Sequence, residues 1–108
     1  MKTNYKFGET FNLSSQVEAS SDKVQFQGIF ETSNGGVALL AFKKGQALDK
    51  HLAPAEVMVT VLEGEIDFTM IDKVHNLRAG DFLLMGADVP HSVLAKADSK
   101  VMLVKIKN

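Results

Sequence analysis

The sequence of 108 residues contains no cysteine. This absence excludes disulfide bonds, a zinc site built from thiolates and a cysteine nucleophile. Long hydrophobic runs are also missing, since no apolar stretch approaches the roughly 18–20 residues that a membrane-spanning helix needs. The opening stretch, MKTNYKFGETFNL, lacks the apolar centre of a secretory signal. We therefore expect a soluble, cytoplasmic protein with no membrane partner.

An excess of positive charge is absent as well. Twelve basic residues stand against thirteen acidic ones, which gives a net charge of -1, and no basic stripe could neutralise the phosphates of a nucleic acid. We therefore expect no nucleic-acid partner. The 45% of hydrophobic and 23% of charged residues are ordinary for a globular protein, and the length suits one domain with a modest core.

Helical periodicity is weak, and short apolar runs separated by turn residues take its place. Residues 56–64, EVMVTVLEG, are apolar on both faces, as in a buried central strand. About eight to ten such runs follow one another at intervals of 8–12 residues, which predicts an antiparallel sandwich or barrel. The polar residues 1–21 are expected to form an N-terminal arm, and residues 22–108 the barrel domain.

Turns are predicted from residues that favour sharp changes of direction. The pair Asn34-Gly35 predicts a two-residue hairpin of type I′, in which both central residues need a positive φ. A second tight turn is expected at Asp72-Lys73, and residues 46–55, QALDKHLAPA, are expected to form a loop.

The stretch GQALDKHLAPAEVMVTVLEGE begins at Gly45 and reaches His51 after five intervening residues. It ends just after Gly64. This spacing resembles the first motif of the cupin family, in which a glycine, five residues and a metal-binding histidine precede a long strand. The positions where that motif has a second histidine and a glutamate hold Ala53 and Val57.

A second stretch, AGDFLLMGADVPHSV, is similar to the second cupin motif. Gly80 and His91 stand at the spacing of that motif, whereas Gly86, Asp88 and Ala95 occupy its proline, glycine and asparagine positions. The glycine and the histidine therefore carry this part of the resemblance.

The resemblance extends over residues 37–107 and is strongest to small single-domain cupins, which carry a histidine shortly before the second motif. His75 stands at that place. The resemblance implies an all-β fold, the cupin double-stranded β-helix or jelly-roll β-barrel, in a single domain that is commonly a homodimer. Many cupins hold a divalent metal inside the barrel.

The three histidines are the candidate metal ligands, and His75 would reach the cavity from a strand of its own. Imidazole suits Zn, Fe, Ni and Cu, and Mn is a further candidate, but two imidazoles alone would hold any of these ions weakly. The alternative for His51 is a loop residue bound to a backbone carbonyl. The alternative for His91 is a turn residue after a proline, and for His75 a cavity-lining or edge residue without metal.

Two sets of alternating apolar residues are candidates for lining a pocket. Val57, Val59 and Val61 share one face of their strand. Phe82 and Leu84 share one face of another. If both faces point inward, they form an apolar cavity for a small molecule. Equally, these residues form only the filled core of a small barrel.

Other side chains are expected on the outside. Met58 and Leu62 alternate with the valines of their strand, so their face needs cover from another sheet or subunit. Glu65 and Asp67 are expected to be solvated. Arg78, the only arginine, is expected to point outward, so the sequence does not support an anionic ligand.

The function that the sequence favours is that of a small cupin binding a small molecule, either directly or through a divalent metal held by histidines. One alternative is a metal-dependent enzyme of the dioxygenase, decarboxylase or isomerase type, which would hold stoichiometric metal with an open coordination position. The other is a metal-free sensing or structural dimer. No catalytic residue is assigned, because the cupin fold supports many reactions.

Overall fold

The computed structural model describes residues 1–108 and contains nine β-strands and one 3-10 helix, η1 (Ser14–Gln16). The strands are β1 (Gln25–Thr32), β2 (Gly35–Phe42), β3 (Ala47–His51), β4 (Glu56–Glu63), β5 (Glu65–Met70), β6 (Lys73–Arg78), β7 (Phe82–Met85), β8 (His91–Ala95) and β9 (Ser99–Ile106). The prediction of an all-β chain with eight to ten short strands is confirmed. Strand β3, however, lies where a loop was expected. None of the helical segments has the length and apolar character needed to cross a membrane.

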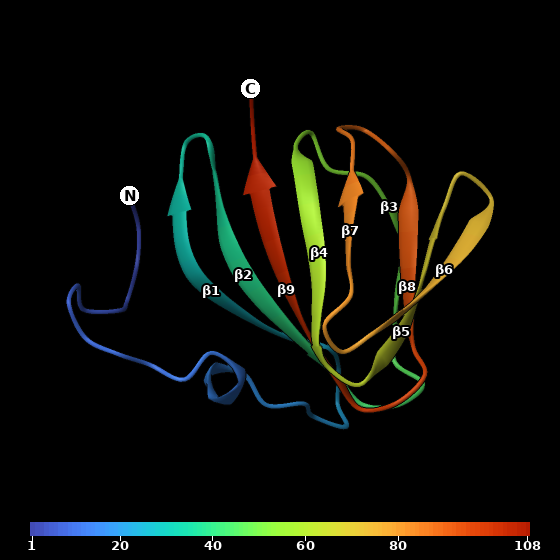
Figure 1. Cartoon of the computed structure of the whole chain (residues 1–108), viewed down its shortest axis with the longest axis horizontal. Helices are drawn as coiled ribbons and strands as arrows, with labels where there is room; N and C mark the ends of the chain where they lie inside the picture. Colours follow the sequence, from blue (N-terminus) through green and yellow to red (C-terminus); the bar gives the residue numbers. More distant parts are fainter.

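The strands form two antiparallel sheets that make the two sides of a barrel (Figure 1). One sheet has the order β1-β2-β9-β4-β7 and the other the order β3-β8-β5-β6. The last strand, β9, lies between β2 and β4, and β8 lies between β3 and β5. Neighbours that are this far apart in sequence are typical of a jelly roll, and the predicted architecture is confirmed.

The core lies between the inner faces of the two sheets. In β4 the alternate residues Val57, Val59 and Val61 are buried, as period-2 alternation requires of a strand with one inner face. Phe42 from the first sheet and Phe68 from the second are the largest fully buried side chains of this core. Burial of such apolar surface contributes roughly 25 cal/mol per Å² to folding.

A second, smaller cluster lies on the outer face of the five-stranded sheet. Val17 of the arm is buried against Leu39 and Ala41 of β2, and Leu62 and Met102 pack against the same cluster. The arm therefore covers part of the outer face of β4, where the sequence predicted cover from another sheet or subunit.

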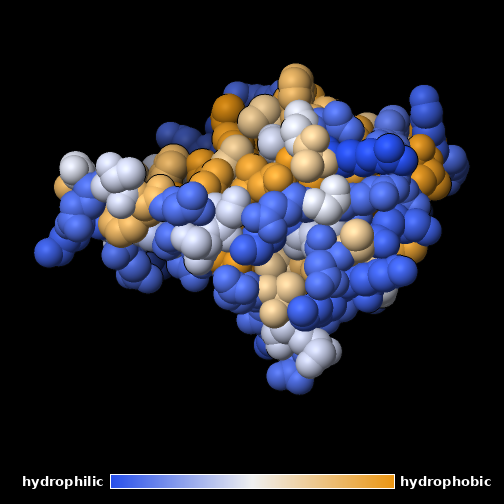
Figure 2. All heavy atoms as spheres, turned by 60° about the horizontal axis from the view of Figure 1, so that its bottom comes forward, coloured by the Kyte–Doolittle hydropathy of each residue, from blue (hydrophilic) through white to orange (hydrophobic).

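The arm also protects the edge of this sheet. The backbones of Lys2 and Glu31 exchange two hydrogen bonds, of 2.7 and 2.9 Å, and the Thr3 hydroxyl donates to the Ile29 carbonyl at 2.6 Å. These contacts satisfy backbone groups of the edge strand β1 that would otherwise face solvent. Figure 2 shows hydrophobic residues in a band from the left to the upper middle of this face, whereas hydrophilic residues dominate its lower right.

Two turns differ from their prediction. The β1–β2 turn is formed by Ser33 and Asn34, neither of which has a positive φ, and Gly35 already belongs to β2. The predicted type I′ turn at this place is therefore wrong. The β5–β6 turn is formed by Ile71 and Asp72, with φ of 52° and 56°, one residue earlier than predicted. The left-handed pair that defines a type I′ hairpin thus occurs here, without glycine.

Candidate functional site

One end of the barrel, the upper end in Figure 1, brings together the end of β3, the start of β4, the end of β7 and the start of β8. The two histidines that match the cupin motifs meet here, because His51 pairs directly with His91 across β3 and β8. A hydrogen bond joins the β3–β4 and β7–β8 connections at this end, since the Asp88 N–H donates to the Ala53 carbonyl at 2.8 Å.

The two imidazole rings lie against each other, but their surroundings differ. Their centroids are 4.1 Å apart and their planes are tilted by 58°. His91 is only 7% exposed and stacks on Phe68, with 5.3 Å between ring centroids and 12° between planes. His51 is exposed to solvent. The pair therefore spans the boundary between the barrel interior and its opening.

Backbone carbonyls orient both rings. The Nδ1 atom of His51 lies 2.8 Å from the Asp49 carbonyl oxygen, and Nδ1 of His91 lies 2.9 Å from the Val89 carbonyl oxygen. Because a carbonyl oxygen only accepts, Nδ1 of each neutral ring carries the proton and donates it. Each Nε2 then keeps a free lone pair, which is the arrangement found in metal-binding histidines.

The electrostatics of the pair favour the neutral form of the inner ring. Burial lowers the pKa of His91 below its ordinary value of 6.5, and the neighbouring His51 lowers it further. The hydrogen bond to the Val89 carbonyl opposes this shift but does not reverse it. Near neutral pH, His91 is therefore an acceptor or ligand rather than a cation.

The structure does not bring His75 into this pair. His75 lies opposite Phe68 across β5 and β6, and β5 separates its strand from β8, which carries His91. His75 is not among the residues that line the cavity below the histidines. No group of three or more histidine, aspartate or glutamate side chains is arranged to hold a metal ion. The three histidines expected to act together are therefore divided into a pair and a single residue.

Below the histidine pair lies a cavity of about 240 Å³. Thirteen of its seventeen lining residues are hydrophobic, so its interior is apolar. Val57 and Val59, two of the predicted lining residues, lie in its wall together with Phe68 from the facing sheet. Val61 is buried on the same face but does not reach the cavity wall.

The prediction that Phe82 and Leu84 line the pocket is wrong. They pair with Thr60 and Met58 of β4, so they share the outer face of the sheet with those residues. Their exposed fractions are 61% and 67%. The sequence FLLM is apolar at every position and therefore does not show which face points inward.

Lys105 is a lining residue that the sequence reading missed. It follows Val101 and Leu103 at intervals of two in β9, and all three line the cavity. This period-2 spacing was the signal that could have placed it on the inner face. Arg78, in contrast, has a side chain that is 74% exposed, as expected of an outward-pointing residue.

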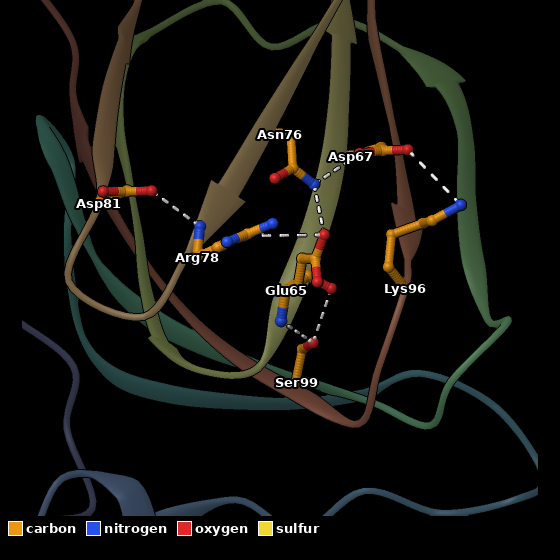
Figure 3. A network of polar contacts seen from close by, with 7 residues as sticks. All are labelled: Glu65, Asp67, Asn76, Arg78, Asp81, Lys96 and Ser99. Carbon is orange, nitrogen blue, oxygen red and sulfur yellow. Dashed lines mark hydrogen bonds and ion pairs between the residues drawn. The ribbon is translucent and has the colours of Figure 1, made fainter.

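The carboxylates of β5 lie on the outer face of the four-stranded sheet, away from the cavity (Figure 3). The Asn76 side-chain amide donates to Glu65 at 2.7 Å and to Asp67 at 3.0 Å. Arg78 pairs with Glu65 at 4.0 Å, and Lys96 pairs with Asp67 at 3.9 Å. These acids belong to a surface network and are not placed to act on a molecule in the barrel.

Comparisons with known proteins agree with this architecture. The family model described as a cupin domain matches residues 38–107. None of the curated proteins matches the sequence. A barrel protein described as cupin 2, from Leptotrichia buccalis, is 32% identical with a TM-score of 0.85, over 90% of this chain and 47% of that one.

Two structures resemble the entire chain. A conserved protein of unknown function from Streptococcus pyogenes has a TM-score of 0.90 at 24% identity, over 100% of this chain and 96% of that one. A cupin superfamily protein from Desulfitobacterium hafniense has a TM-score of 0.89 at 20% identity, over 98% and 97% of the two chains. At these identities the likeness shows the fold alone. Since the family model matches most of the barrel and the strand order is that of a jelly roll, this chain belongs to the cupin family.

Proposed function

We propose that this chain binds a small, largely apolar molecule inside the barrel, with His51 and His91 at the polar end of the site. The observation that carries this proposal is an apolar cavity that opens beside two imidazoles with free Nε2 atoms. Binding sites of small molecules combine an apolar wall with a few oriented polar groups in the same way.

The volume of the cavity limits the size of the bound molecule. A cavity of about 150 Å³ holds benzene, so the 240 Å³ found here suits roughly ten non-hydrogen atoms. Octanamide is a suitable neutral probe, because it has an apolar chain of this size and a polar head that can donate to an imidazole Nε2.

A titration of the ¹⁵N-labelled protein with octanamide, followed by NMR, tests this proposal. We expect saturable shifts that centre on the amides of Val57, Val59 and Val93, which surround the cavity. Val57→Phe fills the cavity and should weaken binding, whereas Met58→Phe, on the opposite face of the same strand, should not. Shifts confined to the outer faces, or equal binding by both variants, would contradict the proposal.

A divalent metal at the histidine pair is a second candidate, supported by the two Nε2 atoms that backbone carbonyls hold in place. The fit is incomplete, because Ala53 and Val57 occupy the positions where the family motif has further ligands. Water or the bound molecule would have to complete the coordination. A metal held here would act as a Lewis acid on an oxygen of that molecule, as in a metal-dependent enzyme.

Elemental analysis of untagged protein tests the metal candidate. The protein is loaded separately with Fe, Zn, Ni, Mn and Cu and then desalted. Near-stoichiometric metal that is lost in both His51→Ala and His91→Ala, and kept in His75→Ala, supports a site made by the pair. Metal-free wild type discards the metalloenzyme alternative and leaves the apolar-ligand proposal in place.

We also propose that two copies of the chain associate through the outer face of the five-stranded sheet. Phe82, Leu84 and Ile106 expose apolar side chains on this face, with exposed fractions of 61%, 67% and 57%. A large exposed apolar face supports association, and a two-fold axis would bring the same patch of both copies together.

A further inference from the structure

We infer that the molecule bound in the barrel carries a carboxylate, and that Lys105 recognises it where the cavity meets a wider groove. This inference rests on the proposed function, since it specifies the chemical class of ligand for the same cavity. It reverses the sequence-based expectation that an anionic ligand is unsupported, which considered only Arg78.

Lys105 is placed by the register of β9. It lies opposite Val57 of β4 and Gly36 of β2, near the end of its strand, and its side chain is half-buried. The alkyl stem of a lysine in such a position packs on apolar neighbours while its ammonium group stays near water. Lys105 therefore presents a positive charge at the edge of an apolar cavity.

No negative charge of the protein neutralises this ammonium group. None of the residues that line the cavity is an aspartate or glutamate. The three ion pairs of the chain use Lys43, Arg78 and Lys96, and Lys105 makes no side-chain hydrogen bond. A cation left free beside a cavity is a ready partner for the carboxylate of a ligand.

The histidine pair does not compete for this role. Each neutral ring uses its N–H at Nδ1 on a backbone carbonyl, so each Nε2 offers only a lone pair. A carboxylate cannot accept a hydrogen bond from such an atom. Lys105 is therefore the one lining side chain that can donate to an anion when the histidines are neutral.

A wider groove of about 600 Å³ adjoins the cavity, and Lys105 lines both. Three lysines, Lys2, Lys105 and Lys107, line this groove against one acidic residue, Glu31. The groove is therefore electropositive. A carboxylate at the junction remains in contact with water, so it avoids the large cost of burying a charge, while its apolar tail fills the cavity.

The test compares octanoate with octanamide, which share size and shape but differ in charge. Both are titrated into the ¹⁵N-labelled protein with EDTA present, so that no metal at the histidines can take the carboxylate. We expect octanoate to bind about ten-fold more tightly. Lys105→Met should remove this preference, and the exposed Lys73→Met should preserve it.

The outcomes separate this inference from the function on which it rests. If octanamide binds in the cavity as tightly as octanoate, or if Lys105→Met keeps the preference, the carboxylate inference is overturned and the proposed function stands. If neither probe shifts the cavity amides, both are overturned. A preference that depends on Lys105 and weakens with added salt supports the inference.

Discussion

His91 has surroundings that differ strongly from those of a free side chain, because it is buried, stacked on Phe68 and paired with His51. These contacts have opposite consequences for function and for stability. Burial keeps the Nε2 lone pair available near neutral pH, and it also makes protonation of the folded protein unfavourable.

We expect the metal-free protein to lose stability in mildly acidic solution because of His91. Below its ordinary pKa of 6.5, the unfolded chain protonates His91 before the folded chain does, since folding lowers this pKa. The free energy of unfolding should therefore fall as the pH decreases from 6.5 toward the lowered pKa, and should be retained above 6.5.

Urea unfolding at about pH 7.5 and about pH 5 measures this effect. The difference in unfolding free energy between the two conditions should be smaller in His91→Asn than in wild type. His75→Asn is the control, because His75 lies outside the pair. An unchanged difference in His91→Asn would show that other groups cause the pH dependence.

Gly64 is a second position where a small change should alter stability, because the fold leaves no room there for a Cβ atom. Its φ is +86°, and an added Cβ would lie 2.3 Å from the Asp98 carbonyl oxygen and 2.4 Å from the Ser99 hydroxyl oxygen. Gly64→Ala should lower the unfolding free energy by about 3 kcal/mol or more, because both neighbours are held in place.

Gly45→Ala is the matched control, since Gly45 has a φ of +90° and nothing within 4 Å of an added Cβ. It should cost only about 1 kcal/mol, the strain of the left-handed backbone. Urea unfolding of both variants gives the comparison. Equal losses would mean that close approach at Gly64 contributes nothing beyond its backbone angle.

Among the elements, the β5–β6 hairpin contains a residue, Ile71, with an unfavourable backbone angle. Ile71 is 78% exposed and β-branched, yet it has a φ of 52°. Such a residue is unfavourable in the left-handed region, which asparagine and glycine adopt more easily. No packing contact in the core depends on it.

Ile71→Asn should therefore raise the unfolding free energy by about 1 kcal/mol, as relief of this strain would predict. Ile71→Val keeps the branched side chain and should leave the stability nearly unchanged. Urea unfolding compares the two variants. Destabilisation by the asparagine would indicate that Ile71 has a partner on this surface.

At the scale of the whole molecule, the two sheets present different outer faces. The four-stranded sheet is covered by a network of charged and amide side chains (Figure 3). The five-stranded sheet exposes Phe82 and Leu84 beyond the area that the arm covers. Val74 and Leu94 are exposed on the first face as well, but they stand beside charged side chains, whereas the second face carries the larger apolar side chains that stable association of copies needs.

We therefore expect wild-type protein to have the mass of a dimer in size-exclusion chromatography with light scattering. Leu84→Lys should shift this mass to that of a monomer, because it places a charge on the apolar face. Val74→Lys, at an exposed position of the other sheet, should leave the dimer intact. A monomeric wild type, or a dimeric Leu84→Lys, would rule out this interface.

The sequence alone was sufficient to predict the class of fold and two residues of the candidate site, His51 and His91. Apolar alternation, turn residues at short intervals and the lack of helical patterns indicated an antiparallel sandwich or barrel, because these features are local. The spacing of Gly45 and His51, and of Gly80 and His91, identified the histidine pair. In this chain β3 and β8 pair His51 with His91 even though Ala53 and Val57 occupy the neighbouring ligand positions of the motif.

Only the tertiary structure decided which side chains share the cavity. Alternation relates residues within a strand but does not say which face is inside, and a shift of one residue exchanges the faces. The pairing of β7 with β4 places Phe82 and Leu84 outside. The spacing of Lys105 from Val101 and Leu103 indicates the inner face only once β9 is known to turn those two residues inward. His75 was placed by the order of strands, since β5 lies between it and His91, and this order depends on pairings between distant segments that no local pattern encodes.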